Sequence, residues 1–139
     1  MRLSNTFLII GAIFCVGTLS GYCEPITIYV SPLGNDEWSG NLSEPNVDKT
    51  NGPLKSIEKA LEKVKEIRIG TSKDNAESVK VILRGGIYSI TKPLVLEPAH
   101  SGTESAPTII ENYENEKPVI SGGIKIDGWQ KDGNLLTAS

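Results

Sequence analysis

The chain has few of the residues that most often carry nucleophilic or metal chemistry. Its 139 residues include one histidine, His100, and two cysteines, Cys15 and Cys23. A Ser-His-Asp triad needs a histidine and His-based metal sites need several, so neither is expected unless another chain contributes. Cys15 lies within an N-terminal apolar run, so no structural disulfide between the two cysteines is expected in the mature protein.

Basic and aromatic residues are also scarce. Lys and Arg total 14 against 17 Asp and Glu, which gives a net charge of -3. The basic residues gather mainly around residues 55–68, where acidic neighbours offset them, so the chain lacks a nucleic-acid-binding signature. Aromatic residues make up only 6% of the chain. A large self-contained core is therefore difficult to build, and we expect the fold to gain burial by stacking onto something.

One apolar run is long, and it lies at the N-terminus. Arg2 precedes the run Phe7 to Val16, and small residues follow it. This order is typical of a secretory signal peptide, and about ten apolar residues are too few to span a bilayer, which needs about 20.

The leader therefore predicts export. We expect residues 1–23 to be a signal peptide cleaved between Ser20 and Cys23, and residues 24–139 to be extracellular or periplasmic, with no membrane association after cleavage. An uncleaved anchor is the weaker alternative, and Tyr22 directly before Cys23 disfavours a lipid anchor.

The rest of the chain is rich in short apolar runs bounded by turn residues. These runs are too short for helices and rich in Val, Ile and Leu, which predicts strands. Tight Asn-Gly or Asp-Gly loops are missing between them and the loop 99–107 is long, so winding into parallel coils is favoured over hairpins. Ile124, Ile126 and Trp129 suggest one more coil. The predicted strands are residues 26–30, 79–83, 93–97, 107–113 and 117–121.

A single amphipathic helix is predicted over residues 53–69. Its apolar stripe recurs every three or four residues, at Leu54, Ile57, Leu61, Val64 and Ile67. Ser56 is placed to cap the first turn, Glu58 suits the positive end of the helix dipole, and Gly70 suits a left-handed residue beyond the last turn.

This helix needs a sheet face to cover its stripe. The strand 79–83 should bury Val79, Val81 and Leu83 on one face, and Ile82 on the other face also needs cover, which we expect the helix to supply. Arg84, Gly85 and Gly86 should turn the chain after this strand.

No residue is assigned a catalytic, cofactor-binding or metal-binding role. Paired carboxyl groups would suit glycoside hydrolysis, but the available carboxylates lie in turn-like contexts, where solvated side chains are the simpler interpretation. The carboxylates considered are Glu111, Glu114, Glu116 and Asp127.

The remaining candidates also have ordinary interpretations. Asp36 and Glu37 beside Asn35 are more simply a turn than a calcium site, because no spaced set of oxygen ligands accompanies them. Trp38 and Trp129 could stack on sugar rings or pack a loop against the body. The tripeptide starting at Asn41 is formally a glycosylation sequon, which has meaning only in a eukaryotic source.

Several stretches resemble the N-terminal region of secreted right-handed parallel β-helix proteins. The order of the stretches matches as well as their amino-acid sequences, and they cover most of residues 28–129. They resemble family 141 of the glycoside hydrolases and related pectate-lyase-like proteins. The stretches are YVSPLGNDEWSG, NGPLKSIEKALEKVKEIR, VKVILRGGIYSITKPLVLEPAHSGTESAPTIIENYENEKPVISGG and IKIDGW.

The resemblance implies a mainly β fold: the N-terminal cap and first coils of a right-handed parallel β-helix, with the amphipathic helix as the cap. It implies a glycoside hydrolase or polysaccharide lyase whose catalytic carboxylates lie on later coils. We therefore expect residues 24–139 to be inactive by themselves, with a polysaccharide and the remaining coils of the same polypeptide as partners. No cofactor is evident, although calcium would suit the full-length protein. A non-catalytic adhesion protein or glycan-binding stalk is the alternative, because a fold alone does not decide chemistry.

Overall fold

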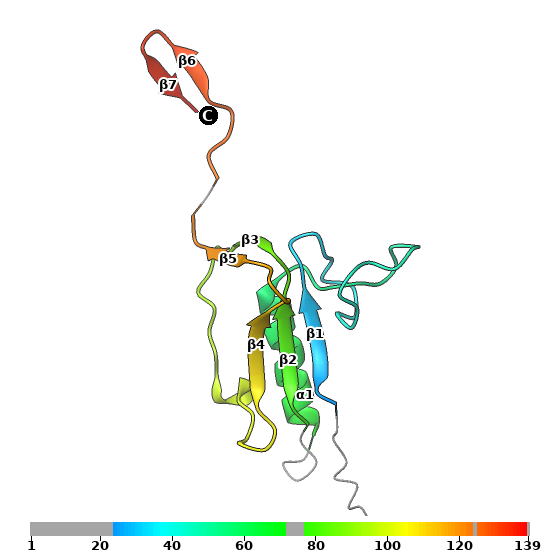
Figure 1. The fold of residues 1–139 in the computed structure, drawn as a ribbon. Coiled ribbons are helices and arrows are strands. Elements are labelled where there is room, and N and C mark those ends of the chain that lie inside the picture. The colour runs from blue at the N-terminus through cyan, green and yellow to red at the C-terminus, as the bar shows by residue number, and fades with distance from the viewer. Residues whose placement is uncertain (1–23, 72–76, 124, 139) are drawn as a thin grey trace, which may run out of the picture.

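The structure is a computed structural model that describes residues 24–71, 77–123 and 125–138. The predicted signal peptide lies outside the described residues, as does most of the connector between the helix and the second strand. In chain order the elements are β1 (Ile26–Val30), α1 (Ile57–Gly70), β2 (Val79–Leu83), β3 (Gly86–Ser89), the 3₁₀ helix η2 (Pro98–His100), β4 (Thr108–Asn112), β5 (Pro118–Ser121), β6 (Gln130–Asp132) and β7 (Leu135–Thr137) (Figure 1). The fold is mainly β, with parallel sheets and one α-helix.

The main sheet has three parallel strands in the order β1-β2-β4. Ile28 pairs with Val81 and Val81 pairs with Ile110, so one row of apolar residues crosses the inner face of the sheet. Residues of alternate parity point to opposite faces of a strand, which is why the Val-rich pattern of β1 and β2 buries one face of each. The strand predictions for residues 26–30, 79–83 and 107–113 are confirmed.

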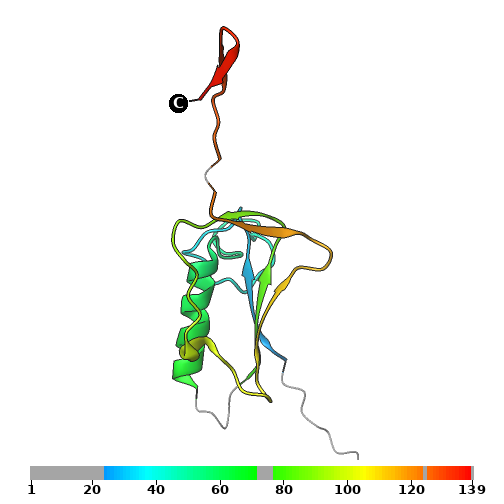
Figure 2. The ribbon, with the colours of Figure 1, turned by 90° about the vertical axis from the view of Figure 1, so that its left-hand side faces the viewer.

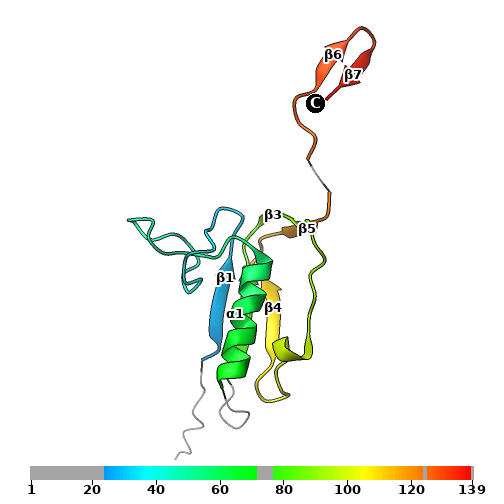
Figure 3. The same ribbon diagram turned by 180° about the vertical axis from the view of Figure 1, so that it is seen from behind.

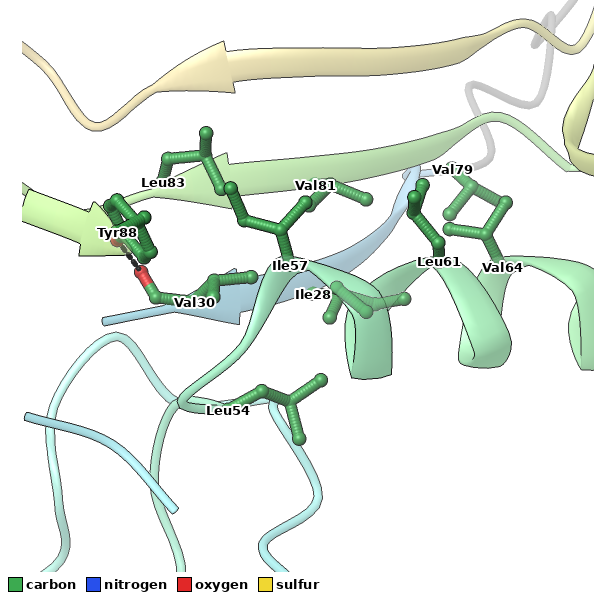
Figure 4. Close-up of a cluster of buried hydrophobic side chains, with 11 residues drawn as sticks. Ile28, Val30, Leu54, Ile57, Leu61, Val64, Val79, Val81, Leu83 and Tyr88 are labelled. Atoms are coloured by element: carbon green, nitrogen blue, oxygen red, sulfur yellow. Dashed lines mark hydrogen bonds between the residues drawn. The ribbon is translucent and has the colours of Figure 1, made fainter. Parts of the chain in front are cut away.

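Helix α1 covers the inner face of the main sheet (Figures 2 and 3). Ile57, Leu61 and Val64 from the helix pack against a core that includes Val30 and Val81 (Figure 4). The amphipathic stripe predicted from the sequence is therefore confirmed. The cap is confirmed as well, because the Ser56 side chain accepts a hydrogen bond from the Lys59 N–H.

Three details of the helix prediction were wrong. Leu54 lies before the helix and forms a parallel bridge with Val30 instead. Gly70 is the last helical residue, and Thr71 follows it in an extended conformation, so the helix has no left-handed terminus. Ile82 receives no cover from the helix, because it alternates with Val81 and Leu83 and so faces the other side of the sheet.

The second sheet pairs β3 with β5 in parallel. It crosses the end of the main sheet (Figure 2). The chain passes from β2 into β3 through Arg84 and Gly85, and the φ of +132° at Gly86 is a conformation that glycine adopts readily. The prediction of strand 117–121 is confirmed by β5, whereas β3 was missed because its first residue was interpreted as part of the turn.

Residues 93–97, predicted as a strand, have no regular secondary structure. They run from β3 to η2, and no strand of the described residues lies beside them. A strand needs a hydrogen-bonding partner as well as apolar residues. Residues 93–97 have the apolar residues, but no strand among the described residues pairs with them. Leu94 still packs against the core.

The last described residues, 125–138, do not form the predicted further coil. β6 and β7 pair as an antiparallel hairpin that stands apart from the body (Figures 1 and 2). The hairpin turns at Gly133 and Asn134, and Gly133 has a φ of +60°. The sequence analysis favoured parallel coils over hairpins, but this two-residue turn is a tight hairpin loop. In the described part of the chain, no helix is long and apolar enough to cross a membrane.

Candidate functional site

The outer face of the main sheet gathers polar and aromatic side chains. Residues of the opposite parity in β1 and β2 are buried beneath α1, so the other residues of these strands and their partners in β4 face outward. They form two rows: Thr27, Lys80 and Ile109 in one, and Tyr29, Ile82 and Glu111 in the other. Lys80 and Glu111 form an ion pair across β2 and β4, with 3.1 Å between Nζ and Oε1.

Arg84 organises the end of this face. Its Nη2 donates a hydrogen bond to Glu116 Oε1 at 2.9 Å and its Nε lies 3.0 Å from Glu116 Oε2, so the carboxylate is held by two guanidinium nitrogens. Its Nη1 donates to the Ser43 carbonyl oxygen at 2.6 Å. The guanidinium also lies 4.6 Å from the centroid of the Tyr113 ring, which is a cation-π distance.

Two aromatic rings complete the outer-face cluster, which we define as Tyr29, Lys80, Arg84, Glu111, Tyr113 and Glu116. The rings of Tyr29 and Tyr113 meet edge to face, with 6.2 Å between centroids and 64° between planes. Arg84 covers the ring of Tyr113. The cluster is therefore a set of contacting aromatic rings and ion pairs on the outer face of the sheet.

The charges of this cluster are fixed by their partners. The hydrogen bond from Arg84 lowers the pKa of Glu116, and the Gly85 N–H, which lies 2.5 Å from Oε2, lowers it further. The same hydrogen bond to Glu116 raises the pKa of Arg84, against a smaller opposing effect of burial. A general acid needs a raised pKa, so Glu116 is unsuited to donate a proton.

Three of the four candidate carboxylates do come together. Glu111, Glu114 and Glu116 line one open hollow beside the end of β4, with a volume of ≈ 610 Å³. Glu111 and Glu116 face cations, and Glu114 lies in the turn with a φ of 46°. Asp127 is remote from them, in the segment that stands apart, and pairs with Lys125 at 2.9 Å.

The Asn35–Glu37 turn holds the two residues that precede helix α1. Asp36 Oδ1 accepts hydrogen bonds from the backbone N–H groups of Lys55 and Ser56, both at 2.8 Å, and Oδ2 accepts one from the Ser56 hydroxyl. Burial alone would raise the pKa of Asp36, but these hydrogen bonds and the charge of Lys55 together lower it. Among the described residues, no group of three His, Cys, Asp or Glu side chains is placed to hold a metal ion.

The other candidates have structural roles or stand exposed. His100 is buried, and its Nδ1 accepts a hydrogen bond from the Glu97 N–H at 2.8 Å. Trp38 packs against Gly52, where an added Cβ would lie 2.7 Å from the ring, so it holds the loop to the body. Trp129 is 57% exposed. Asn41 is exposed in the same loop, and its role as a sequon stays a prediction.

Sequence reasoning missed Arg84 and Tyr113 as partners. Arg84 was interpreted only as a turn residue and Tyr113 only as the end of a strand. The available signal was an arginine directly after a buried strand, because an arginine beside a sheet face needs a carboxylate or an aromatic ring nearby.

The sequence was compared with family models and with known proteins. No family model matches the chain. The chain is 34% identical over 95 residues to the uncharacterized protein YwoF of Bacillus subtilis (strain 168), and 33% identical over 95 residues to the pectate lyase PEL9 of Emericella nidulans. Each match covers 68% of this chain.

A solved structure is similar as well. A protein described as a glycoside hydrolase matches with a TM-score of 0.68 and 34% sequence identity over 81% of this chain. The chain spans only 15% and 18% of the lengths of the two curated relatives and 18% of the glycoside hydrolase. The chain is therefore similar in sequence to a small part of each of these three proteins, and similar in fold to a small part of the glycoside hydrolase.

Proposed function

We propose that residues 24–139 form the N-terminal cap and first coils of a secreted right-handed parallel β-helix protein that acts on polysaccharide as a glycoside hydrolase or polysaccharide lyase. The observation that carries this proposal is the parallel pairing of strands in two sheets that follow each other along the chain. β2 stacks on β1 and β4 stacks on β2, while β5 stacks on β3. A chain that returns twice to the same sheet in the same direction is coiling.

Two features support the cap and the handedness. Strand-to-strand connections within one parallel sheet are right-handed in about 98% of cases, and α1 lies in such a connection between β1 and β2. α1 also covers the inner face beside the first strand, where a coiled stack would otherwise present its apolar interior to water.

Polysaccharide as the substrate class is supported by the names of the similar proteins, a pectate lyase and a glycoside hydrolase. The catalytic residues are proposed to lie on further coils. The carboxylates best placed for chemistry in this chain, Glu111 and Glu116, are neutralised by Lys80 and Arg84. Glycoside hydrolysis needs one protonated and one free carboxyl group, and this pairing provides neither.

The test is turnover by purified residues 24–139. The protein is incubated with polygalacturonate and with a panel of plant and microbial polysaccharides, and both reducing ends and unsaturated products are measured. No product above that of heat-treated protein is expected. Release of either product would contradict the placement of the active site outside these residues.

Export is proposed on the composition of residues 1–23 and is tested separately. Those residues are fused to a phosphatase that is active only after export, and a version with Phe7→Asp and Ile10→Asp is the control. Export of the first fusion alone is expected, because charges in the apolar run prevent its recognition. Equal activity of the two fusions would contradict the assignment.

A non-catalytic glycan-binding stalk is the second candidate, and the outer-face cluster favours it. Aromatic rings and paired charges are groups that bind sugars without reacting, and the cluster presents both. Retention of residues 24–139 on an insoluble polysaccharide without turnover, reduced in Tyr113→Ala, would favour this role for the chain.

A further inference from the structure

Asn51 and Gly52 are adjacent in the loop between β1 and α1, which runs beside the β1 edge (Figure 1). Asparagine followed by glycine is the dipeptide in which a side-chain amide is lost most readily, because glycine has no side chain to obstruct its backbone nitrogen. The sequence contains this dipeptide once. A chemically labile pair therefore lies in the segment that covers the β1 edge.

Packing requires the glycine. An added Cβ at Gly52 would lie 2.7 Å from the Trp38 ring and 2.9 Å from the Cα atom of Pro45, so a larger residue does not fit unless the loop moves. Gly52 is buried, and its carbonyl oxygen accepts a hydrogen bond from the Gly40 N–H at 3.1 Å. The residue that makes the dipeptide labile is therefore the one that the loop accommodates.

Hydrogen bonding requires the asparagine. Asn51 Oδ1 accepts hydrogen bonds from the Ser39 N–H at 2.9 Å and from the Ser39 hydroxyl at 2.8 Å. Asn51 Nδ2 donates a hydrogen bond to Asn41 Oδ1 at 3.3 Å. A side-chain amide accepts and donates at the same time, whereas an ionised carboxylate only accepts, so the loop depends on an intact Asn51.

The same contacts hold the pair in an unreactive arrangement. Loss of the amide requires the lone pair of the Gly52 nitrogen to attack Asn51 Cγ. In the structure the Gly52 N–H instead donates to Asn51 Oδ1 at 2.9 Å. The N–H bond lies in the peptide plane and the lone pair is perpendicular to that plane, so the attacking orbital is directed away from Cγ. Ser39 keeps Oδ1 in place, and burial of Gly52 shields its nitrogen from the hydroxide that must remove the proton.

We propose that Asn51 is a deamidation site that reacts only when this loop opens. In the open loop, hydroxide takes the Gly52 N–H proton, the nitrogen forms a bond to Asn51 Cγ, and the Cγ–Nδ2 bond breaks. The leaving nitrogen takes a proton from water and departs as ammonia. Water then opens the cyclic imide at either carbonyl group, which leaves aspartate or isoaspartate. The net reaction consumes one water, releases one ammonia and needs no oxidant or reductant.

The products do not fit the closed loop. Aspartate has no Nδ2 hydrogen for Asn41 Oδ1, so a carboxylate oxygen would face that acceptor instead. Isoaspartate adds a backbone carbon directly before Gly52, which is held by Gly40. The Gly40 carbonyl oxygen in turn accepts a hydrogen bond from the Tyr29 N–H of β1 at 2.7 Å. Deamidation therefore loosens the cover of the β1 edge irreversibly.

The rate of deamidation in the full chain tests the dependence on loop opening. The folded chain and the chain unfolded in guanidinium chloride are kept at the same mildly alkaline pH, and peptide mapping by mass spectrometry follows Asn51. The folded chain is expected to react at least about tenfold more slowly, because its loop is open for a small fraction of the time. Equal rates would overturn the protection by the loop. Reaction of the unfolded chain at Asn46, which precedes Val47, and not at Asn51 would overturn the site itself.

A substitution at Ser39 tests which contact protects the amide. Ser39→Ala removes the hydroxyl donor to Asn51 and is expected to raise the folded-state rate about threefold or more, with the unfolded-state rate unchanged. Ser43→Ala is the matched control, because the Ser43 hydroxyl makes no hydrogen bond among the described residues of the same loop. Equal folded-state rates in the two variants would overturn the role of Ser39. The folded and unfolded parent chains decide the effect of loop opening even if Ser39→Ala does not fold.

Hydrogen exchange in the deamidated chain tests the consequence. The product carries one more negative charge and is separated by ion-exchange chromatography. The Tyr29 and Leu54 amides, whose hydrogen bonds join the loop to β1, are expected to exchange at least about tenfold faster than in the parent. The Val79 amide donates to the Pro107 carbonyl oxygen at the start of β2 and should be unchanged. Unchanged exchange at Tyr29 and Leu54 would overturn the loosening of the β1 edge.

Discussion

The two edges of the main sheet differ in how they end. At the β1 edge, Tyr29 N–H donates to the Gly40 carbonyl oxygen at 2.7 Å, and Leu54 N–H donates to the Tyr29 carbonyl oxygen at 2.8 Å. At the β4 edge, no strand of the described residues is paired. Val30 on β1 is fully buried, whereas Ile110 on β4 is 42% exposed.

The difference shows that the β1 edge is covered by the chain, whereas the β4 edge has no cover among the described residues. The loop between β1 and α1 folds back over the β1 edge and satisfies its backbone groups, as an edge in contact with water requires. At the β4 edge no further strand of the described residues is paired, and the apolar side chain of Ile110 reaches water. The same chemistry applied at the two edges should therefore have unequal effects.

Placing a carboxylate at each edge should give the largest contrast. Val30→Asp is expected to abolish cooperative folding, because burying an unpaired charge costs several kcal/mol out of a typical total of about 5–15 kcal/mol. Ile110→Asp is expected to cost about 1 kcal/mol or less, since the new carboxylate can reach water. Urea unfolding followed by tryptophan fluorescence measures both. Equal loss in the two variants would mean that the β4 edge is covered in solution.

Removing a hydroxyl at the closed side should have the next largest effect. The Tyr88 hydroxyl lies 2.9 Å from the Val30 carbonyl oxygen and 2.7 Å from that of Arg84, which ties β1 to the turn after β2 (Figure 4). Tyr88→Phe is expected to cost about 1–3 kcal/mol, because buried carbonyl groups lose their donor. Ile120→Val, at the residue of β5 paired with Tyr88, is the control and should stay within about 0.5 kcal/mol.

Tyr88 also predicts a loss of stability in alkali. Burial raises the pKa of Tyr88 to about 12, against a lowering by the hydrogen bond to Arg84. The unfolded chain releases this proton near pH 10, so the contribution is complete below that pH and is lost as the pH rises toward 12. Tyr88→Phe should flatten this part of the stability profile. A parental profile that stays level between pH 10 and 12 would contradict the assignment.

The hydrogen bonds of Asp36 secure the loop that closes the β1 edge, and their loss should have a smaller effect. Asp36→Asn is expected to cost about 0.5–2 kcal/mol, because the amide replaces an ionised acceptor of three hydrogen bonds. The lowered pKa of Asp36 means that its contribution is complete above its ordinary value of 3.8 and is lost as the pH falls through the folded value. Glu37→Gln is the matched control and should change neither the stability nor the acid profile by a comparable amount.

The smallest effect is expected at the outer face. Lys80→Met breaks the ion pair with Glu111, whose side chain is 42% exposed, so water screens the interaction. The free energy of unfolding should change by less than about 1 kcal/mol. Raising the salt concentration should weaken the parent and leave the variant less affected. A loss as large as that of Tyr88→Phe would show that the outer-face ion pair contributes as much to stability as the buried hydrogen bonds of Tyr88, and would contradict this prediction.

Much of the closed side could be predicted because its signals are local. The alternation in β1 and β2, the helical spacing of Ile57, Leu61 and Val64, and the Ser56 cap each depend on residues a few positions apart. The open side was predicted less well. Residues 93–97 have the composition of a strand, but a strand also needs a neighbour, and that neighbour comes from elsewhere in the chain.

The candidate site was also predicted only in part. The sequence indicated that Glu111, Glu114 and Glu116 are close in the chain, but it gave no sign that Lys80 and Arg84 would pair with two of them. Asp36 was interpreted as part of a turn, and its hydrogen bonds to the start of the helix depend on Ser56, 20 residues later. Partners distant in the chain are brought together only by the register of β2 on β4 and the return of the loop over β1.

The amino-acid order by itself determined which residues would be buried in the first two strands, which residues of the helix would face the core, and that the strands of the main sheet would run parallel. Only the tertiary structure decided which carboxylates are neutralised, which face of β2 the helix covers, and which edge of the sheet is left open. The physical reason is that hydrophobic periodicity depends on residues a few positions apart in the chain. Ion pairs and the coverage of sheet edges depend instead on distances between segments that folding must first bring together.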